Sequence, residues 1–342
     1  MENCSNCTTA QPGTFHTTEF LVFSIVMLLI AVTAIFFNIL TAVILSTRKE
    51  VLLPIRILLV NLLAGVIFTA VAVVIQNMDS IILATHSSAP PMEALCRAYV
   101  WFFRSSAAVR LCNLAAYSIA VIVVVKKKNE SLKPVHTLPA ITVTWVYALV
   151  VSIHWIIPSA LRYTYIAGVR CISQSNPTIP WLKMVLLSLW IVATGIIPTV
   201  ICITVITVAL CYIRKLRESE VTQFKKGLVR LALFLFLANI SNLINMIVPP
   251  ILVNLDPNLS ITSYFITSMD VIMLWGTGIV LVIFIKPVKT KVAAILSCSW
   301  CKRQHSSSSV DGQARFSTSY KEVTLLDESN EISDWTNSYR RH

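Results

Sequence analysis

Three ionisable residues lie inside long apolar stretches of the sequence: Arg104, Arg110 and Asp270. Charge in a hydrocarbon environment is costly, so such residues pair with one another, line a polar cavity or contact a ligand. Arg104 and Arg110 are six positions apart, which corresponds to about 9 Å along a helix. Two compatible interpretations follow: an ion pair that joins two helices, and charges that line a ligand-binding cavity.

Residues suited to covalent, metal or phosphate chemistry are sparse. Of the six histidines only His154 lies in an apolar stretch, and no cluster of His, Asp and Glu has the spacing of metal ligands. The sequence has no Gly-x-Ser-x-Gly nucleophile motif, phosphate-binding loop or pair of carboxylates. We therefore expect no enzyme, no cofactor and no metal site. His154 beside Trp155 is interpreted as a packing or interfacial residue.

The composition indicates an integral membrane protein. Of the 342 residues, 56% are hydrophobic and 13% are charged, and the mean hydropathy is +0.74. A soluble domain carries about a quarter charged residues and could not bury this much apolar surface. These values exclude a soluble enzyme, a disordered chain and an ordinary nucleic-acid-binding domain. The net charge of +12 lies mainly in short loops between apolar stretches, which is a signal of membrane topology.

Seven stretches are long enough to cross a bilayer as helices, which takes about 20 apolar residues each. They lack the alternation of β-barrel strands, so the predicted fold class is all-α, a seven-helix transmembrane bundle. The predicted helices are 20–46, 57–76, 98–125, 138–158, 184–213, 227–253 and 261–285. The bundle domain covers 20–297 and ends in a short amphipathic stretch at 289–297. Residues 1–19 precede it and a Ser-rich tail, 298–342, follows it.

The distribution of Lys and Arg predicts an extracellular N-terminus and a cytoplasmic C-terminus. The loops after the first, third and fifth helices, with the stretch after the seventh, hold eighteen basic residues, whereas the opposite loops hold four. Short loops rich in Lys and Arg stay on the cytoplasmic side. Sequons at Asn3 and Asn6 predict glycosylation of the outer N-terminus, with unmodified loop asparagines as the alternative.

Cysteines on the outer side are candidates for a disulfide. Cys96 begins the third helix and Cys171 lies in the second outer loop, so both face an oxidising compartment and a bridge between them is plausible. The residues alone leave other pairings open. Cys4 or Cys7 could take one of these partners, or the two could pair with each other.

Several positions resemble motifs of the rhodopsin-like G-protein-coupled receptors, over roughly residues 20–301. The positions that carry the resemblance are Asn38 with Val43 in helix one, Asn61-Leu62 in helix two, Trp145 in helix four, Pro198 in helix five and Phe236 in helix six. The resemblance implies a Cys96–Cys171 disulfide. It also implies a multi-pass plasma-membrane receptor for an unknown, potentially chemosensory, extracellular ligand, with a heterotrimeric G protein or arrestin as intracellular partner and no nucleic-acid partner.

The sequence departs from the pattern of that family at its activation motifs, which identifies it as an atypical member. Val66 stands where the family has an aspartate, and Ala120-Val121-Ile122 stands where it has Asp-Arg-Tyr. Helix six lacks the usual tryptophan and proline, and helix seven lacks Asn-Pro-x-x-Tyr. The alternative function is therefore a receptor-fold protein without ordinary G-protein coupling: a decoy, a chaperone or a partner subunit. A transporter or channel is disfavoured because no internal repeat is visible.

The resemblance also predicts how the buried charges are arranged. In the family the outer half of helix three faces helix seven, which implies that Asp270 pairs with Arg104. Because Val66 leaves no acid to hold a sodium ion, we expect Arg110 to occupy that space. Its expected partners are polar groups such as Asn113, Asn242 or Thr277. An incompletely neutralised arginine would favour an anionic or carbonyl-rich ligand.

The C-terminal segment carries candidates for modification. Cys298 and Cys301 follow the amphipathic stretch beside basic residues, which predicts S-palmitoylation. Ser306 to Ser309, together with Ser317, Thr318 and Ser319, lie in a polar tail without apolar periodicity. In a receptor such serines are kinase targets that recruit arrestin-like partners; a solvated linker is the alternative.

Overall fold

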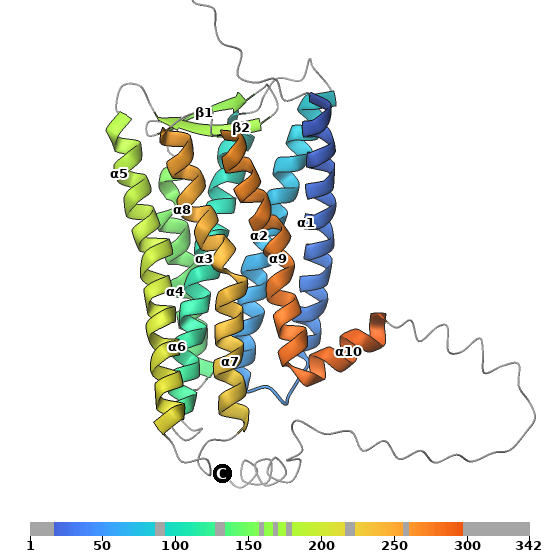
Figure 1. Cartoon of the computed structure of the whole chain (residues 1–342), viewed down its shortest axis with the longest axis vertical. Coiled ribbons are helices and arrows are strands. Elements are labelled where there is room, and N and C mark those ends of the chain that lie inside the picture. Colours follow the sequence, from blue (N-terminus) through green and yellow to red (C-terminus); the bar gives the residue numbers. More distant parts are fainter. Residues whose placement is uncertain are drawn as a thin grey trace, which may run out of the picture.

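The long apolar segments form helices that stand side by side, as the computed structural model of the chain shows (Figure 1). It describes residues 17–85, 93–126, 134–156, 161–166, 170–175, 180–215, 223–255 and 260–296. The first four long helices are α1 (Thr17–Ser46), α2 (Leu53–Thr85), α3 (Glu93–Lys126) and α4 (Pro134–Val151), followed by the single 3₁₀ turn η1 (Ile153–Trp155). The later ones are α5 (Pro180–Ile191), α6 (Ile197–Lys215), α7 (Gln223–Ala238), α8 (Ile240–Leu255), α9 (Ser260–Phe284) and α10 (Lys286–Leu296).

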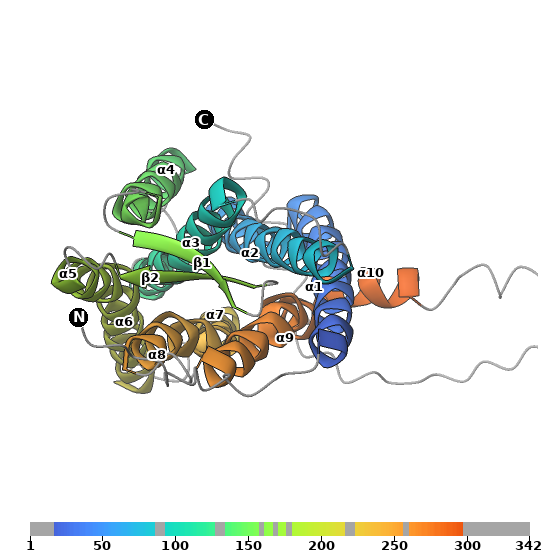
Figure 2. The same cartoon turned by 90° about the horizontal axis from the view of Figure 1, so that it is seen from above.

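A β-hairpin connects the fourth and fifth helical rods. Its strands are β1 (Leu161–Ile166) and β2 (Arg170–Ser175), which pair antiparallel from Leu161 opposite Ser175 to Ile166 opposite Arg170. The hairpin lies across one end of the bundle, and α10 lies at the other end (Figures 1 and 2). We refer to these as the hairpin end and the α10 end.

Apart from α10, the described helices form seven rods, because two pairs of helices continue one another. The π-helical segment η2 (Val192–Ile196) joins α5 to α6, and the single residue Asn239 joins α7 to α8. The helix α3 contacts α2, α4, α6, α7 and α8, and α4 lies at the periphery of the bundle (Figure 2). The predicted all-α seven-helix architecture is confirmed, and the hairpin is an addition that helical periodicity alone did not predict.

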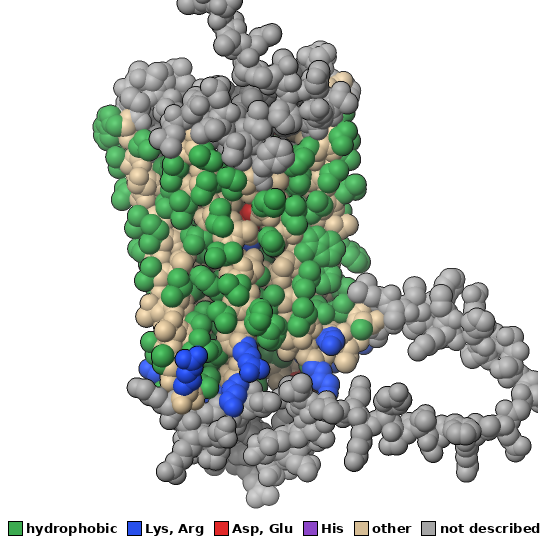
Figure 3. Space-filling model, in the orientation of Figure 1, with side chains coloured by type: hydrophobic (Ala, Val, Ile, Leu, Met, Phe, Trp, Pro, Cys, Tyr) green, Lys and Arg blue, Asp and Glu red, His purple; other side chains and the backbone are tan. Residues whose placement is uncertain are grey.

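The bundle has the dimensions and surface of a multi-pass membrane protein. Six described helical spans are long and apolar enough to cross a membrane, and α9 with α10 forms a seventh candidate that bends by 107°. Large apolar side chains face outward: Phe36, Val135 and Ile283 are 71%, 71% and 62% exposed. On the face drawn in Figure 3 apolar side chains are spread over the described length of the bundle, and Lys and Arg gather at the α10 end.

Pro198 ends the hydrogen-bond pattern of the π-helical segment in the fifth rod. A π-helix pairs each carbonyl with the N–H five residues on, as Val192 does with Ile197. The carbonyl of Ala193 would need the N–H of Pro198, which proline lacks. The Tyr147 hydroxyl from α4 donates to this carbonyl instead, at 2.9 Å. The hydrogen bond from Tyr147 to this free carbonyl therefore connects α4 to the fifth rod.

Asn239 interrupts the sixth rod where α7 ends and α8 begins. Its backbone N–H is shared between the carbonyls of Leu235 and Phe236, at 3.2 and 3.0 Å. Its side-chain amide donates to the same Leu235 carbonyl at 2.8 Å. Asparagine competes with the helix for backbone partners in this way. The consequence is a local irregularity at the level of the buried charges.

Candidate functional site

An ion pair lies buried at the centre of the bundle and joins α3 to α9. Nη1 of Arg110 lies 3.3 Å from Oδ2 of Asp270, and the side chains are 0% and 1% exposed. The expected pairing of Asp270 with Arg104 is therefore wrong, because the turn of α3 directs Arg110 toward α9. Figure 3 shows a small acidic and a small basic spot close together at mid-height, surrounded by apolar side chains and uncharged atoms.

The sixth rod supplies the hydrogen bonds that a buried ion pair requires. Nε and Nη2 of Arg110 donate to Oδ1 of Asn239 at 3.3 and 3.1 Å. On the other side, the Ser241 hydroxyl donates to Oδ1 of Asp270 at 3.1 Å and the Asn245 amide donates to Oδ2 at 3.4 Å. Desolvating two charges is costly, and the pair is tolerated only when its remaining donors and acceptors are satisfied. These five residues form the central polar network.

The residues that the sequence suggested as partners of Arg110 make hydrogen bonds to other groups. The Asn113 amide donates to the Asn61 carbonyl at 3.4 Å, and the Asn242 amide donates to the Ala107 carbonyl at 2.9 Å. Thr277 is linked to Arg110 only through Asn239, because its hydroxyl accepts a hydrogen bond from the Asn239 amide at 3.2 Å. The expectation is thus wrong for direct contact.

Sequence reasoning missed Asn239, Ser241 and Asn245 as partners of the charges. A signal was present, because Asn239, Asn242 and Asn245 recur at intervals of three in an otherwise apolar helix. Residues three positions apart are neighbours on the surface of a helix, so each asparagine lies next to the following one. Only the packed bundle shows that this side faces Arg110 and Asp270.

Gly65 on α2 makes room for the arginine. A Cβ at this position would lie 3.2 Å from Cγ of Arg110. Its neighbour Val66, where the resemblance predicted an acid in related receptors, is fully buried. The cationic side chain thus packs against α2 through its carbon stem and takes its anionic partner from α9.

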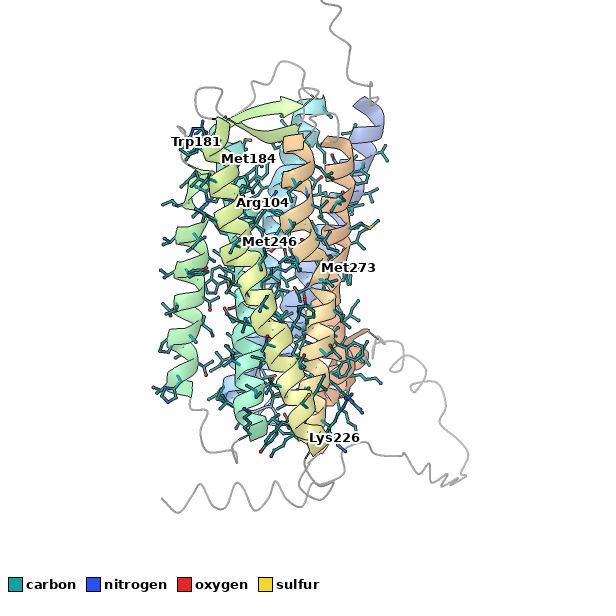
Figure 4. All side chains as sticks on the ribbon, turned by 60° about the vertical axis from the view of Figure 1, so that its left-hand side comes forward. Arg104, Trp181, Met184, Lys226, Met246 and Met273 are labelled. Atoms are coloured by element: carbon teal, nitrogen blue, oxygen red, sulfur yellow. The ribbon has the colours of Figure 1, made fainter. Side chains whose placement is uncertain are left out.

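Arg104 lies in the half of the bundle nearer the hairpin, at the position labelled in Figure 4. Its Nη1 donates to the Asn245 carbonyl at 3.3 Å. Its guanidinium carbon lies 5.2 Å from the ring centre of Trp155, 5.7 Å from that of Trp190 and 5.8 Å from that of Phe103. Such distances allow cation–π attraction. Because the Asn245 amide bonds Asp270, one residue of α8 links the Arg104 group to the central polar network.

Two of the asparagines that carry the family resemblance make bonds between helices. The Asn38 amide on α1 donates to the Leu274 carbonyl of α9 at 3.1 Å, while Nε1 of Trp145 on α4 donates to Oδ1 of Asn61 on α2 at 2.9 Å. Both contacts fix the relative position of neighbouring rods.

Other predicted sites lie at or beyond the edge of the described residues. Asn3, Asn6, Cys298 and Cys301 lie outside them. Cys96 is disulfide-bonded. Cys171 belongs to β2, but its side chain lies outside the described part, so the pairing of the two stays a prediction.

We expect that Cys96 and Cys171 are joined. A bridge that closes a loop of some 75 residues constrains the unfolded chain and adds about 4 kcal/mol to stability. Peptide mapping under non-reducing conditions should recover the two residues in one linked peptide. Recovery of Cys96 linked to Cys4 or Cys7 would contradict the pairing.

Comparison with known proteins places the fold. No protein-family profile matches the chain, and no curated protein matches its sequence. Among 774 chains of known structure that match, a crystal structure of squid rhodopsin covers 90% of this chain and 91% of its own, with a TM-score of 0.63 and 10% identity. So low an identity establishes the fold alone. The chain therefore has the seven-helix fold that squid rhodopsin shows.

Proposed function

We propose that the protein is a plasma-membrane receptor that binds an extracellular ligand at the hairpin end and transmits the change toward the α10 end. The observation that carries this proposal is the central polar network, in which Arg110 and Asp270 connect α3, α9 and the sixth rod. A ligand shifts a conformational equilibrium only through contacts that differ between two states. Asn245 supports such coupling. Its backbone carbonyl accepts a hydrogen bond from Arg104, and its side-chain amide donates one to Asp270.

The charge distribution supports the orientation that this proposal needs. Described basic residues concentrate at the α10 end, as Figure 3 shows on one face. The exposed lysines of α10 include Lys286, Lys289 and Lys291. Segments rich in Lys and Arg next to the ends of membrane-spanning helices remain on the cytoplasmic side of a membrane. The hairpin end would then face the exterior, together with Asn3 and Asn6.

A second candidate function is a receptor-fold protein that does not couple to G proteins in the usual way. Ala120, Val121 and Ile122 offer no charge near the α10 end of α3, and Val121 is 1% exposed. A buried aliphatic side chain cannot reproduce the forked hydrogen bonds of an arginine. The observation favours a decoy, chaperone or partner subunit, or signalling through arrestin.

One cell experiment separates these functions. The full chain carries an N-terminal epitope tag, and staining of intact cells measures surface delivery and orientation. In the same cells we expect basal G-protein activation to equal that of an empty vector, and a ligand screen to produce arrestin recruitment or internalisation. A strong basal or ligand-driven nucleotide exchange on a purified G protein would contradict the expected weak coupling.

The controls make failure of the receptor proposal visible. A variant with Ser306–Ser309 replaced by alanine should reach the surface equally and recruit less arrestin. Surface protein that gives neither G-protein activation nor arrestin recruitment across the screen would favour the decoy or partner-subunit function. Staining only after permeabilisation would overturn the orientation.

A further inference from the structure

A second polar group lies beside Arg104, outside the central polar network. His154 belongs to η1 and is 7% exposed. Its ring centre lies 5.0 Å from that of Trp155 and 6.4 Å from that of Trp190. These are two of the rings that flank the Arg104 guanidinium, so Arg104 and His154 border the same pair of indoles.

The hydrogen bonds of His154 define what its second nitrogen can do. Nδ1 lies 3.0 Å from the Val151 carbonyl, which can only accept, so Nδ1 carries the proton of this bond. In the neutral ring Nε2 is then an acceptor. Among the described residues Nε2 is buried without a hydrogen-bond partner. A buried acceptor left unsatisfied is unfavourable, which points to a donor supplied from outside the described chain.

The surrounding rings leave a narrow range of chemistry for that donor. The rings of Trp155 and Trp190 meet edge to face, with 5.7 Å between their centres. Nε1 of Trp190 donates a hydrogen bond to the Ser152 hydroxyl at 3.0 Å, so it is not available to a ligand. Arg104 projects from α3, contacts α8 through the Asn245 carbonyl and the fifth rod through Trp190, and is partly exposed. The site thus presents a cation, an acceptor and aromatic faces.

We propose that Arg104 and His154, which border the same two rings of Trp155 and Trp190, form the recognition site for an aryl carboxylate that carries an O–H or N–H donor. The carboxylate accepts from the Arg104 guanidinium, whose planar fork matches its geometry. The ligand hydroxyl or amine donates to Nε2 of His154. The aryl ring packs against the indoles, where aromatic pairs prefer edge or offset contacts. This inference rests on the proposed receptor function and names the class of its ligand.

Three related compounds test the proposal on the full chain in nanodiscs of neutral lipid. 3-Phenyllactate has the acid and the hydroxyl, 3-phenylpropionate lacks the hydroxyl, and methyl 3-phenyllactate lacks the charge. Binding is measured as the ligand-dependent rise of the thermal midpoint. We expect an affinity order of 3-phenyllactate, then 3-phenylpropionate, then the ester.

Two substitutions assign the two contacts. Arg104→Gln should weaken 3-phenyllactate by about 10- to 100-fold and abolish the preference for acid over ester, because a charge-assisted bond is lost. His154→Phe keeps a ring beside the indoles. It should abolish only the preference for 3-phenyllactate over 3-phenylpropionate, which we expect to be about 2- to 10-fold in the unaltered protein. Matched controls are Arg230→Gln and His136→Phe, which change exposed residues of α7 and α4.

Each outcome decides the proposal. Equal binding of acid and ester, or an Arg104→Gln variant that binds like Arg230→Gln, would overturn it. Absence of stabilisation by all three compounds would overturn the ligand class. If Arg104→Gln does not fold, the comparison of the three compounds on the unaltered protein still decides. The basal and surface-delivery arms of the cell experiment need no ligand, so failure here is distinguishable from failure of the receptor proposal.

Discussion

Replacing Asp270 with asparagine is expected to destabilise the protein by about 3–5 kcal/mol, because it leaves the Arg110 charge buried without its counter-ion. Arg110→Met should have a similar effect, because it leaves the Asp270 carboxylate buried without its counter-ion. Both residues are at most 1% exposed, so water cannot replace the missing partner. Thermal unfolding of detergent-purified protein, together with surface expression, measures the loss.

A double replacement distinguishes ion pairing from simple packing. Arg110→Met with Asp270→Leu removes both charges, and an apolar replacement of a buried ion pair is often neutral or stabilising. We therefore expect the double variant to be more stable than either single one. Glu50→Gln, at an exposed position, serves as the control for loss of one carboxylate. An Asp270→Asn variant as stable as Glu50→Gln would refute the energetic role of the pair.

Adding one methyl group at Gly278 is expected to destabilise the contact between α9 and α1 by about 1–3 kcal/mol, since a packed interface does not accommodate extra volume. A Cβ there would lie 2.8 Å from Oδ1 of Asn38 and 2.9 Å from a ring carbon of Phe37. Neither group can move freely. The Asn38 amide is bonded to the Leu274 carbonyl, and the Phe37 ring stacks on Trp275 at 5.1 Å.

Three substitutions separate this clash from a general effect of glycine replacement. At Gly227 nothing lies within 4 Å of the added Cβ, so Gly227→Ala should be neutral or stabilising by up to about 1 kcal/mol. Gly276→Ala meets only an ordinary contact, 3.4 Å from Cβ of Ala238. Gly278→Val should be worse than Gly278→Ala. Equal midpoints for Gly278→Ala and Gly227→Ala would disprove the close approach of α1.

The prediction of the helices from the sequence succeeded because the relevant property is local. An apolar run of sufficient length must satisfy its backbone internally in lipid, which requires a helix wherever the run occurs. The cost of charge in hydrocarbon likewise singles out Arg104, Arg110 and Asp270 from their positions within apolar runs. The hairpin of β1 and β2 escaped this reasoning, since it lies between the apolar runs.

The partners of the charges depended on features that no single segment contains. Arg104 and Arg110 are both on α3, and the rotation and tilt of that helix against α9 decide which of them meets Asp270. Asn239, Ser241 and Asn245 became partners because the sixth rod, interrupted at Asn239, packs against the buried ion pair. The sequence alone determined which charged residues need polar partners within the membrane. The tertiary structure decided which partners they have. Helix rotation, helix depth and the close packing at Gly65 and Gly278 are set by contacts between segments far apart in the chain.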